Sequence, residues 1–272
     1  MKFMVCVLIV LVHEAAFSQT NKYWVFFHDK PHNASLKKSV IESLPERTVQ
    51  RRLKNSPIDV TDEYDFPINA SYIEQIESSG IAIQRQSKWF NAVTAYLDAA
   101  QIHTAKQLPF VKSIQPVAKG FKDRITSSPN QSSTSAFNLQ YGASQKQNAM
   151  INTINAHTLG YSGKGVLIGM IDTGFNLTHE AFDSIKVVGK YDFIDNDTDV
   201  SEPLGSKGGS SHGTQVLSTI AGYADGRLIG TAFGASFLLA RTEDDDGIGE
   251  QAEEDQWIAG LEWLEEQGAD IV

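Results

Sequence analysis

Two residues of this chain have the chemistry and the surroundings of a proton-transfer pair. Asp172 directly follows residues 165–171, an apolar run with the length of a strand buried on both faces. A carboxylate in that position needs a partner, because burying an unpaired charge is costly. His212 opens a helical stretch, and the helix dipole lowers its proton affinity, which suits a neutral imidazole that acts as a general base.

Each residue alone also has an ordinary explanation. Asp172-Thr173-Gly174 can simply start a turn, and a single histidine at the start of a helix can be a polar surface residue. Asp-Thr-Gly is also the triplet of aspartic proteases, but that class requires an all-β lobe, and the pattern here is α/β. The two residues are therefore informative as a pair.

Strands and helices alternate around the pair. The apolar runs of strand length are residues 165–171, 235–240 and 269–272. The helical segments between them are residues 213–223 and 250–267. In the last helical segment, Trp257, Leu261 and Leu264 recur at helical spacing, with Ile258 beside them. The alternation predicts a parallel α/β sheet, and reactive residues of such sheets gather at the carboxyl ends of the strands.

The two motifs together resemble the subtilisin-like serine proteases. The sequence around Asp172 and the segment Ser211-His212-Gly213-Thr214 match the family's aspartate and histidine segments, within roughly residues 150 to 272. The Asp, His, Ser order is a property of that family. The resemblance implies that Asp172 orients the imidazole of His212 and stabilises the imidazolium, while His212 takes a proton from a serine and returns it to the leaving amine.

The nucleophilic serine has no counterpart in this sequence. Ser128, Ser132 and Ser218 stand in the wrong context, and neither a Gly-Thr-Ser-like segment nor the oxyanion-hole asparagine occurs before Val272. We therefore expect the N-terminal fragment of a secreted serine endopeptidase, inactive by itself because the triad needs its nucleophile. The alternative is a non-catalytic secreted protease inhibitor, or a degenerate remnant, that ends naturally at Val272.

The first half has the element order of a small split βαβ domain. The order strand, helix, strand, strand, helix, strand is predicted from residues 23–27, 71–79, 81–85, 89–97, 99–108 and 110–114. Residues 36–53 form a further helical region, in which Pro45 marks a break or a start. Ser71 and Glu74 predict a capping box for the helix at 71–79. Precursors of the resembled family often carry such a prodomain, which aids folding and inhibits the enzyme.

Four segments follow from these patterns. Residues 1–18 have the charge, apolar run and small residues of a secretory signal peptide, and they hold the only cysteine, Cys6. Residues 19–120 are the predicted prodomain, residues 121–148 a linker with the processing region, and residues 149–272 the N-terminal part of the peptidase domain. The predicted fold class is α/β, an incomplete subtilisin-like parallel sheet with flanking helices after a small α+β prodomain.

The net charge and the composition limit the classes of molecule that the protein is expected to bind. A net charge of -10 argues against nucleic acid, which requires clustered Lys and Arg. We expect protein or peptide substrates, the intramolecular prodomain as a partner, a secreted product, and no membrane association after signal removal. The triad chemistry requires no cofactor. The acidic run Asp195-Asn196-Asp197-Thr198-Asp199 lacks the glycine and glutamate of an EF-hand, so it is either a solvated loop or a calcium site of another kind.

Overall fold

The computed structural model describes residues 20–55, 59–118, 139–201, 212–244 and 253–272. The predicted signal peptide and most of the predicted linker lie outside these ranges, as does Ser211. In the described residues, no helix combines the length and the apolar composition needed to cross a bilayer.

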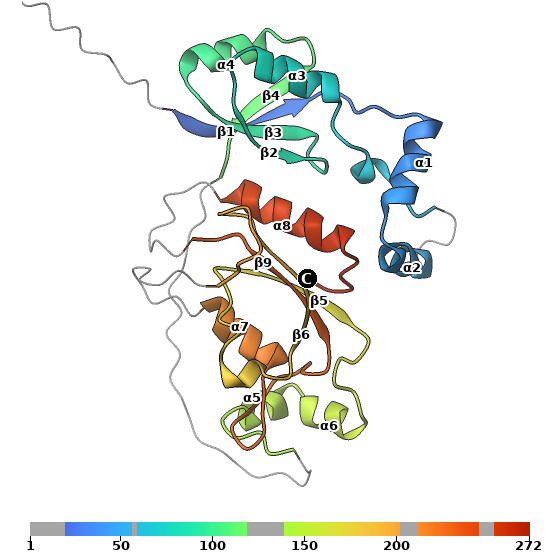
Figure 1. Cartoon of the computed structure of the whole chain (residues 1–272), viewed down its shortest axis with the longest axis vertical. Helices are drawn as coiled ribbons and strands as arrows, with labels where there is room; N and C mark the ends of the chain where they lie inside the picture. The colour runs from blue at the N-terminus through green and yellow to red at the C-terminus, as the bar shows by residue number, and fades with distance from the viewer. Residues whose placement is uncertain (1–19, 56–58, 119–138, 202–211, 245–252) are drawn as a thin grey trace, which may run out of the picture.

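The first unit is a four-stranded antiparallel sheet with two helices on one face (Figure 1). Its strands and helices are β1 Asn21–Phe27, α3 Ala70–Ser78, β2 Ile83–Ser87, β3 Ala92–Leu97, α4 Ala99–Lys106 and β4 Val111–Pro116. The spatial order is β2-β3-β1-β4, which is the arrangement of the predicted split βαβ domain. Its core forms where alternate residues of the central strands, such as Val25 and Val93, pack against α3 and α4.

Two local predictions in this unit need correction. Asn69, and not Ser71, caps α3, because its side-chain oxygen accepts hydrogen bonds from both the backbone N–H and the hydroxyl of Ser71. The third strand begins at Ala92 and not at position 89, since Trp89 lies in the turn between β2 and β3. Asn91 adopts a positive φ of 49° in that turn, a conformation that asparagine tolerates better than most residues.

Two further helices are inserted between β1 and α3. The insertion consists of α1 Ala34–Ser43, α2 Glu46–Asn55 and the short 3-10 helix η1 Glu63–Asp65. Pro45 immediately precedes α2, where its fixed φ and missing N–H are tolerated, so it marks a helix start as the sequence suggests. Figure 1 shows the insertion beside the C-terminal end of α8, away from the four-stranded sheet.

The second unit is a parallel sheet covered by helices on both faces. Its main elements are β5 Leu167–Asp172, β6 Lys186–Asp192, α7 His212–Ala221, β9 Ser236–Arg241 and α8 Glu254–Glu266. The strand order is β5-β9-β6, and Ile271 adds a single parallel bridge to Ile168 where the sequence predicts a further strand. Alternate strand residues face α7 on one side and α8 on the other, as a sheet buried on both faces requires.

Smaller elements complete the second unit. They are α5 Gln145–Met150, α6 Thr153–Thr158, the 3-10 helix η2 Glu180–Phe182, β7 Tyr223–Ala224 and β8 Leu228–Ile229. Residues 139–148, which the sequence places in the linker, pack against this unit. Tyr141 is buried with Ile154 and Ile229, and Asn148 donates a hydrogen bond to the carbonyl oxygen of Ile229. Burial of these side chains ties the segment to the β7-β8 hairpin.

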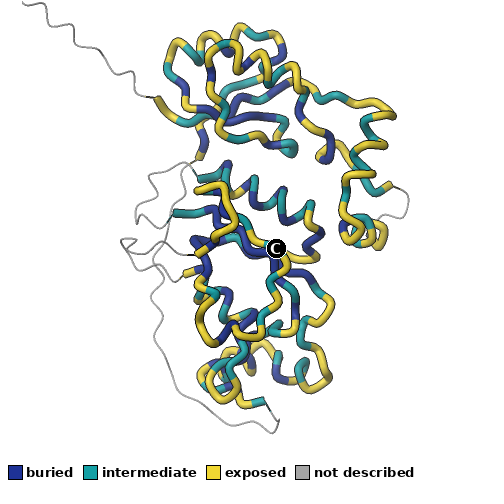
Figure 2. The backbone as a smooth tube through the Cα atoms, viewed as in Figure 1, coloured by how far each residue is buried: buried dark blue, intermediate teal, exposed yellow. Residues whose placement is uncertain are grey.

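Helix α8 lies between the two sheets, and both of its long faces are covered (Figures 1 and 2). Ile258 and Leu264 are buried, and Leu264 packs on Leu167 and Leu238 of the parallel sheet. Gly169 of β5 allows this close packing, because a Cβ there would lie 2.8 Å from a methyl carbon of Leu264. Trp257, which the helical spacing places with the buried residues, is 45% exposed.

The opposite face of α8 presents carboxylates to the four-stranded sheet. Asp255 is 1% exposed and accepts hydrogen bonds from Lys22 Nζ at 2.8 Å and Thr94 Oγ1 at 2.7 Å. Glu254 accepts from the indole N–H of Trp24 at 3.0 Å. Each partner comes from the first unit, so the carboxylates are satisfied only while the two units are in contact.

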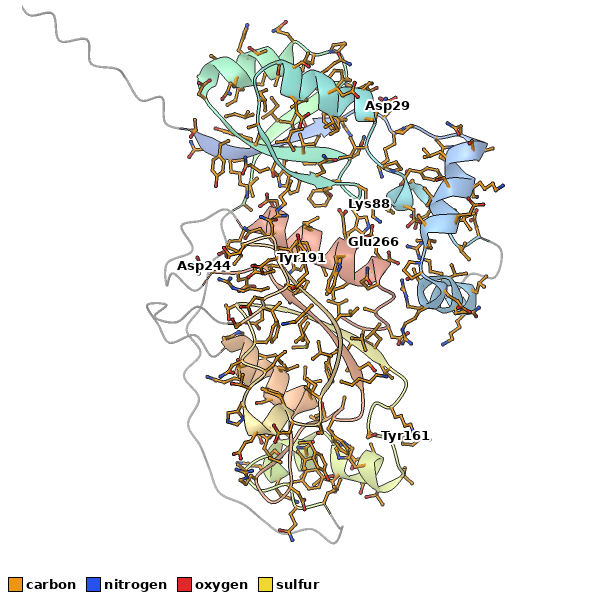
Figure 3. All side chains as sticks on the ribbon, in the orientation of Figure 1. Asp29, Lys88, Tyr161, Tyr191, Asp244 and Glu266 are labelled. Atoms are coloured by element: carbon orange, nitrogen blue, oxygen red, sulfur yellow. The ribbon has the colours of Figure 1, made fainter. Side chains whose placement is uncertain are left out.

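Glu262 is the third of these carboxylates. It is 8% exposed, and it accepts hydrogen bonds from the hydroxyl of Ser87 at 2.6 Å and from the backbone N–H of Trp89 at 3.2 Å. Burial raises its pKa above the ordinary value, although these hydrogen bonds and the nearby Lys88 favour the charged form. The backbone N–H of Lys88 also donates to Glu262 at 3.3 Å, and the Lys88 side chain pairs with Glu266 of α8; Figure 3 labels both members of this pair.

Arginines of the insertion bind the C-terminal end of α8. Arg52 forms a two-point ion pair with Asp65, at 2.7 and 2.8 Å, and also contacts Glu265 of α8 at 2.8 Å. Arg51 pairs with the same Glu265. Arg47 donates to the backbone oxygen of Gly268 at 3.2 Å. Cations at a helix C-terminus also interact favourably with the helix dipole.

Substitution of Glu262 by Gln should change how stability depends on pH. The folded-state pKa of Glu262 is raised, so its contribution to the stability of the fold is fully present below the ordinary pKa of 4.5. That contribution is lost as the pH rises through the raised pKa. The unfolding free energy of the wild type, relative to E262Q, should therefore fall as the pH rises above 4.5. Urea unfolding at a series of pH values measures the difference.

The exposed Glu77 of α3 provides the control, since E77Q removes the same charge without a buried partner. A wild-type advantage over E262Q that stays constant or grows with pH would contradict this account of Glu262.

Candidate active site

Asp172 is the last residue of β5, at the carboxyl edge of the parallel sheet. The strand buries its apolar residues and leaves Asp172 only 6% exposed. The backbone N–H of Thr173 donates to Asp172 Oδ1 at 2.7 Å, and the Thr173 hydroxyl donates to the same oxygen at 3.1 Å. These donors compensate the buried charge and fix the orientation of the carboxylate.

His212 is the first residue of α7, and its imidazole reaches back to Asp172. Nδ1 lies 2.8 Å from Oδ1 and 3.0 Å from Oδ2 of the carboxylate. An ionised carboxylate only accepts hydrogen bonds, so Nδ1 must carry a proton and the neutral ring keeps a lone pair on Nε2. The His212 side chain is 69% exposed, and Nε2 has no hydrogen-bond partner among the described residues.

Close packing of α7 on the end of β5 makes this contact geometrically possible. Gly213 follows His212 and approaches the backbone oxygen of Gly174 so closely that a Cβ would collide with it. The same Cβ would lie 2.9 Å from the Cβ of Asp172. Glycine is therefore the residue that lets the start of α7 lie against Asp172. The hydroxyl of Thr214 accepts a hydrogen bond from the N–H of Asn176 at 2.8 Å, which ties the helix to the loop after Asp172.

Arg241 is a charged residue of this edge that the sequence analysis did not identify. It ends β9 and is 3% exposed, with Nη1 2.6 Å from Asp192 Oδ2 and 3.0 Å from Asp195 Oδ2. Burial lowers the pKa of Arg241, but the hydrogen bonds and charges of the two aspartates outweigh it and raise the pKa overall. An arginine that ends an otherwise apolar strand is the signal that could have drawn attention to it.

The acidic run contributes to this network. Asp195 pairs with Arg241, and Asp197 forms a backbone bridge with Asp192. Within the described residues, no three His, Cys, Asp or Glu side chains are grouped so that they could hold a metal ion. A calcium site of another kind therefore stays a prediction. Ser211, the first residue of the Ser211-His212-Gly213-Thr214 motif, lies outside the described residues.

The edge therefore presents an oriented general base. The carboxylate is held by Thr173, the imidazole is held by the carboxylate, and most of the His212 side chain is exposed to solvent. This arrangement can take a proton from a hydroxyl placed against Nε2 and can stabilise the imidazolium that forms.

Comparison with protein families agrees with this geometry. Residues 163–272 match the model of the subtilase family, and residues 22–135 match the model described as the peptidase S8 propeptide domain of Bacteroidota. The two matches fall on the two units of the structure. Asp172 and His212 both lie within the subtilase match.

Individual relatives include proteases of Bacillus subtilis. Subtilisin E is 29% identical over 199 residues, which are 72% of this chain and 45% of that protein. The minor extracellular protease Vpr is 38% identical over 128 residues, covering 45% of this chain and 15% of that protein. The chain thus spans about half the length of the subtilisins that it matches.

Among solved structures, fervidolysin from Fervidobacterium pennivorans has a similar fold. The TM-score is 0.56 at 17% sequence identity, with 93% of this chain and 35% of that chain covered. The similarity supports the arrangement of an α+β unit followed by a parallel α/β sheet.

Substitution of Gly213 by Ala should destabilise the chain and separate α7 from β5. The added methyl group has no room between Gly174 and Asp172, and overpacking of this kind costs about 1–3 kcal/mol. Urea unfolding measures the change. The control T219A alters an exposed position of the same helix and should stay within about 0.5 kcal/mol of the wild type. Equal stability of G213A and T219A would show that the close approach is not needed.

Proposed function

Because the chain belongs to the subtilase family, we propose that it supplies the aspartate and histidine of a secreted serine endopeptidase. In this proposal Asp172 and His212 act with a serine to hydrolyse peptide bonds of protein or peptide substrates. The observation that carries it is the hydrogen bond from His212 Nδ1 to Asp172, at 2.8 Å, on the carboxyl edge of a parallel sheet. The exposed Nε2 would face the serine.

The roles of the two residues follow from this contact. Asp172 fixes the tautomer with the proton on Nδ1, so that Nε2 can accept the serine proton during attack. The same carboxylate stabilises the imidazolium until it gives the proton to the leaving amine. No cofactor takes part in these steps. The nucleophile would come from outside the described residues, and residues 1–272 without it should not hydrolyse peptides at a useful rate.

We further propose that the first unit is the inhibitory prodomain of the same protein. Support comes from the propeptide-model match and from the carboxylates of α8, which find their hydrogen-bond partners in that unit. Export through the signal peptide at residues 1–18 would deliver the precursor outside the cell. The linker between the units would then be the place where the chain is cut.

The test of the peptidase function starts from the coding sequence beyond codon 272. If the frame continues, the full product should react with a fluorophosphonate probe, which labels activated serines. H212A should lower kcat by about 10⁶-fold and D172N by about 10⁴-fold, as removal of these two members of a triad does. Labelling that persists at the wild-type rate in H212A would contradict the assigned roles.

A stop directly after codon 272 would favour the alternative of a non-catalytic secreted inhibitor. In that case a stable secreted product of this length should be found in the medium, and it should not react with the probe. Mass spectrometry of the secreted protein distinguishes a longer peptidase from a secreted inhibitor of this length.

Contact between the units should outlast a cut in the linker. Trypsin can cleave at Lys122 or Arg124, and the two pieces should then elute together from a gel-filtration column. In E265Q, Arg51 and Arg52 of α2 lose the charged acceptor that they bind on α8. The two pieces should therefore dissociate about tenfold more readily. The control E42Q removes an exposed pairing partner of Lys38 and should leave the association unchanged. Immediate separation of the wild-type pieces would contradict the prodomain proposal.

A further inference from the structure

Arg241 occupies the centre of the carboxyl edge of the parallel sheet. In the strand register it lies directly beside Asp172 of β5 on one side and Asp192 of β6 on the other. Its side chain is almost completely buried, as is that of Asp192, which is 0% exposed. A buried cation of this kind is stable only where its N–H donors form hydrogen bonds and ion pairs with nearby acceptors.

The guanidinium joins both neighbouring strands. Nη1 binds Asp192 and Asp195, at 2.6 and 3.0 Å, while Nε donates to the backbone oxygen of Thr173 at 3.1 Å. The planar group has its N–H donors in fixed directions, so an arginine held by two aspartates also fixes the position of the Thr173 carbonyl.

Thr173 is the residue that orients Asp172. Its N–H and its hydroxyl both donate to Asp172 Oδ1, the oxygen that lies 2.8 Å from His212 Nδ1. The backbone of Asp172 is held from the same side, where Thr242, the residue after Arg241, donates its N–H to the Asp172 carbonyl at 3.1 Å. Any movement of the Thr173 peptide would therefore be transmitted to the carboxylate.

We propose that Arg241 is a positioning residue for the Asp172–His212 pair. It holds the Thr173 peptide so that Asp172 accepts a hydrogen bond from the Nδ1–H of His212 and selects the tautomer with Nε2 unprotonated. The inference rests on the proposed function, because the tautomer matters only if His212 acts as a base. It goes beyond that function by assigning a catalytic consequence to a residue that cannot touch the substrate.

Arg241→Lys separates this role from simple stabilisation. A lysine keeps the positive charge and can still pair with Asp192, but its single ammonium group cannot reproduce the fork that also reaches Thr173. The fold should therefore persist while the hydrogen bond to the Thr173 carbonyl is lost.

The readout is the tautomer of neutral His212 in the 272-residue chain. Imidazole ¹⁵N chemical shifts distinguish protonation at Nδ1 from protonation at Nε2, and the H212Q spectrum identifies the signals. The wild type should have the proton on Nδ1. In R241K the ratio of the two tautomers should move towards Nε2–H by about tenfold, the change expected from about one lost hydrogen bond. D172N, which removes the carboxylate, should abolish the Nδ1 preference.

Arg227→Lys is the matched control, because Arg227 forms an exposed pair with Glu180 and touches neither Asp172 nor Thr173. It should leave the ratio unchanged. A folded R241K chain with a ratio within about twofold of the wild type would overturn the proposal. If R241K does not fold, Asp195→Asn removes one of the aspartates that hold the guanidinium, at a side chain that is 65% exposed.

D195N should shift the ratio in the same direction by about threefold, and an unchanged ratio in that variant would also overturn the proposal. A wild-type chain that carries its proton on Nε2 would contradict the Asp172–His212 pair itself and with it the proposed function. A normal wild type with an unaffected R241K would contradict only the role of Arg241.

Discussion

Helix α8 imposes the strongest constraint on this structure, because it is a single helix buried between two sheets. A helix in that position must satisfy two environments at once. Ile258 and Leu264 bury apolar area, and Leu264 does so on the parallel sheet. On the other side, Asp255 and Glu262 are buried carboxylates whose donors all belong to the first unit. The two units therefore meet through hydrogen-bonded charge, and their separation would leave those carboxylates to be solvated anew.

The sequence predicts the elements on each side of this helix better than it predicts the contacts between them. Strand β5, helix α7 and the positions of Asp172 and His212 follow from local patterns, since a buried strand and a helix start are encoded by neighbouring residues. The polar face of α8 could not be predicted, because an acidic residue on a helix ordinarily faces solvent. Its burial depends on Ser87, Thr94 and Lys22, which are distant in the sequence.

The candidate site also combines residues that the sequence predicts with contacts that it does not predict. Its two principal residues carry recognisable motifs, whereas the residues that hold them do not. Thr173 acts through its backbone and hydroxyl, and Gly213 acts by lacking a side chain. Arg241 becomes significant only when the strand register places it between Asp172 and Asp192. Support for a reactive group is thus distributed over three strands and one helix, and only the assembled sheet brings these residues together.

The polar face of α8 also has a consequence for the order of events during biosynthesis. Its partners are separated along the chain by 175 residues for Ser87 and Glu262, and by 233 residues for Lys22 and Asp255. Loop closure over such distances is slow, whereas the four-stranded unit is made from shorter-range contacts and leaves the ribosome first. That unit can therefore be complete while α8 is still being translated. The later helix would then meet a preformed surface of donors, and the proposed prodomain would act as a template on which the C-terminal half is assembled.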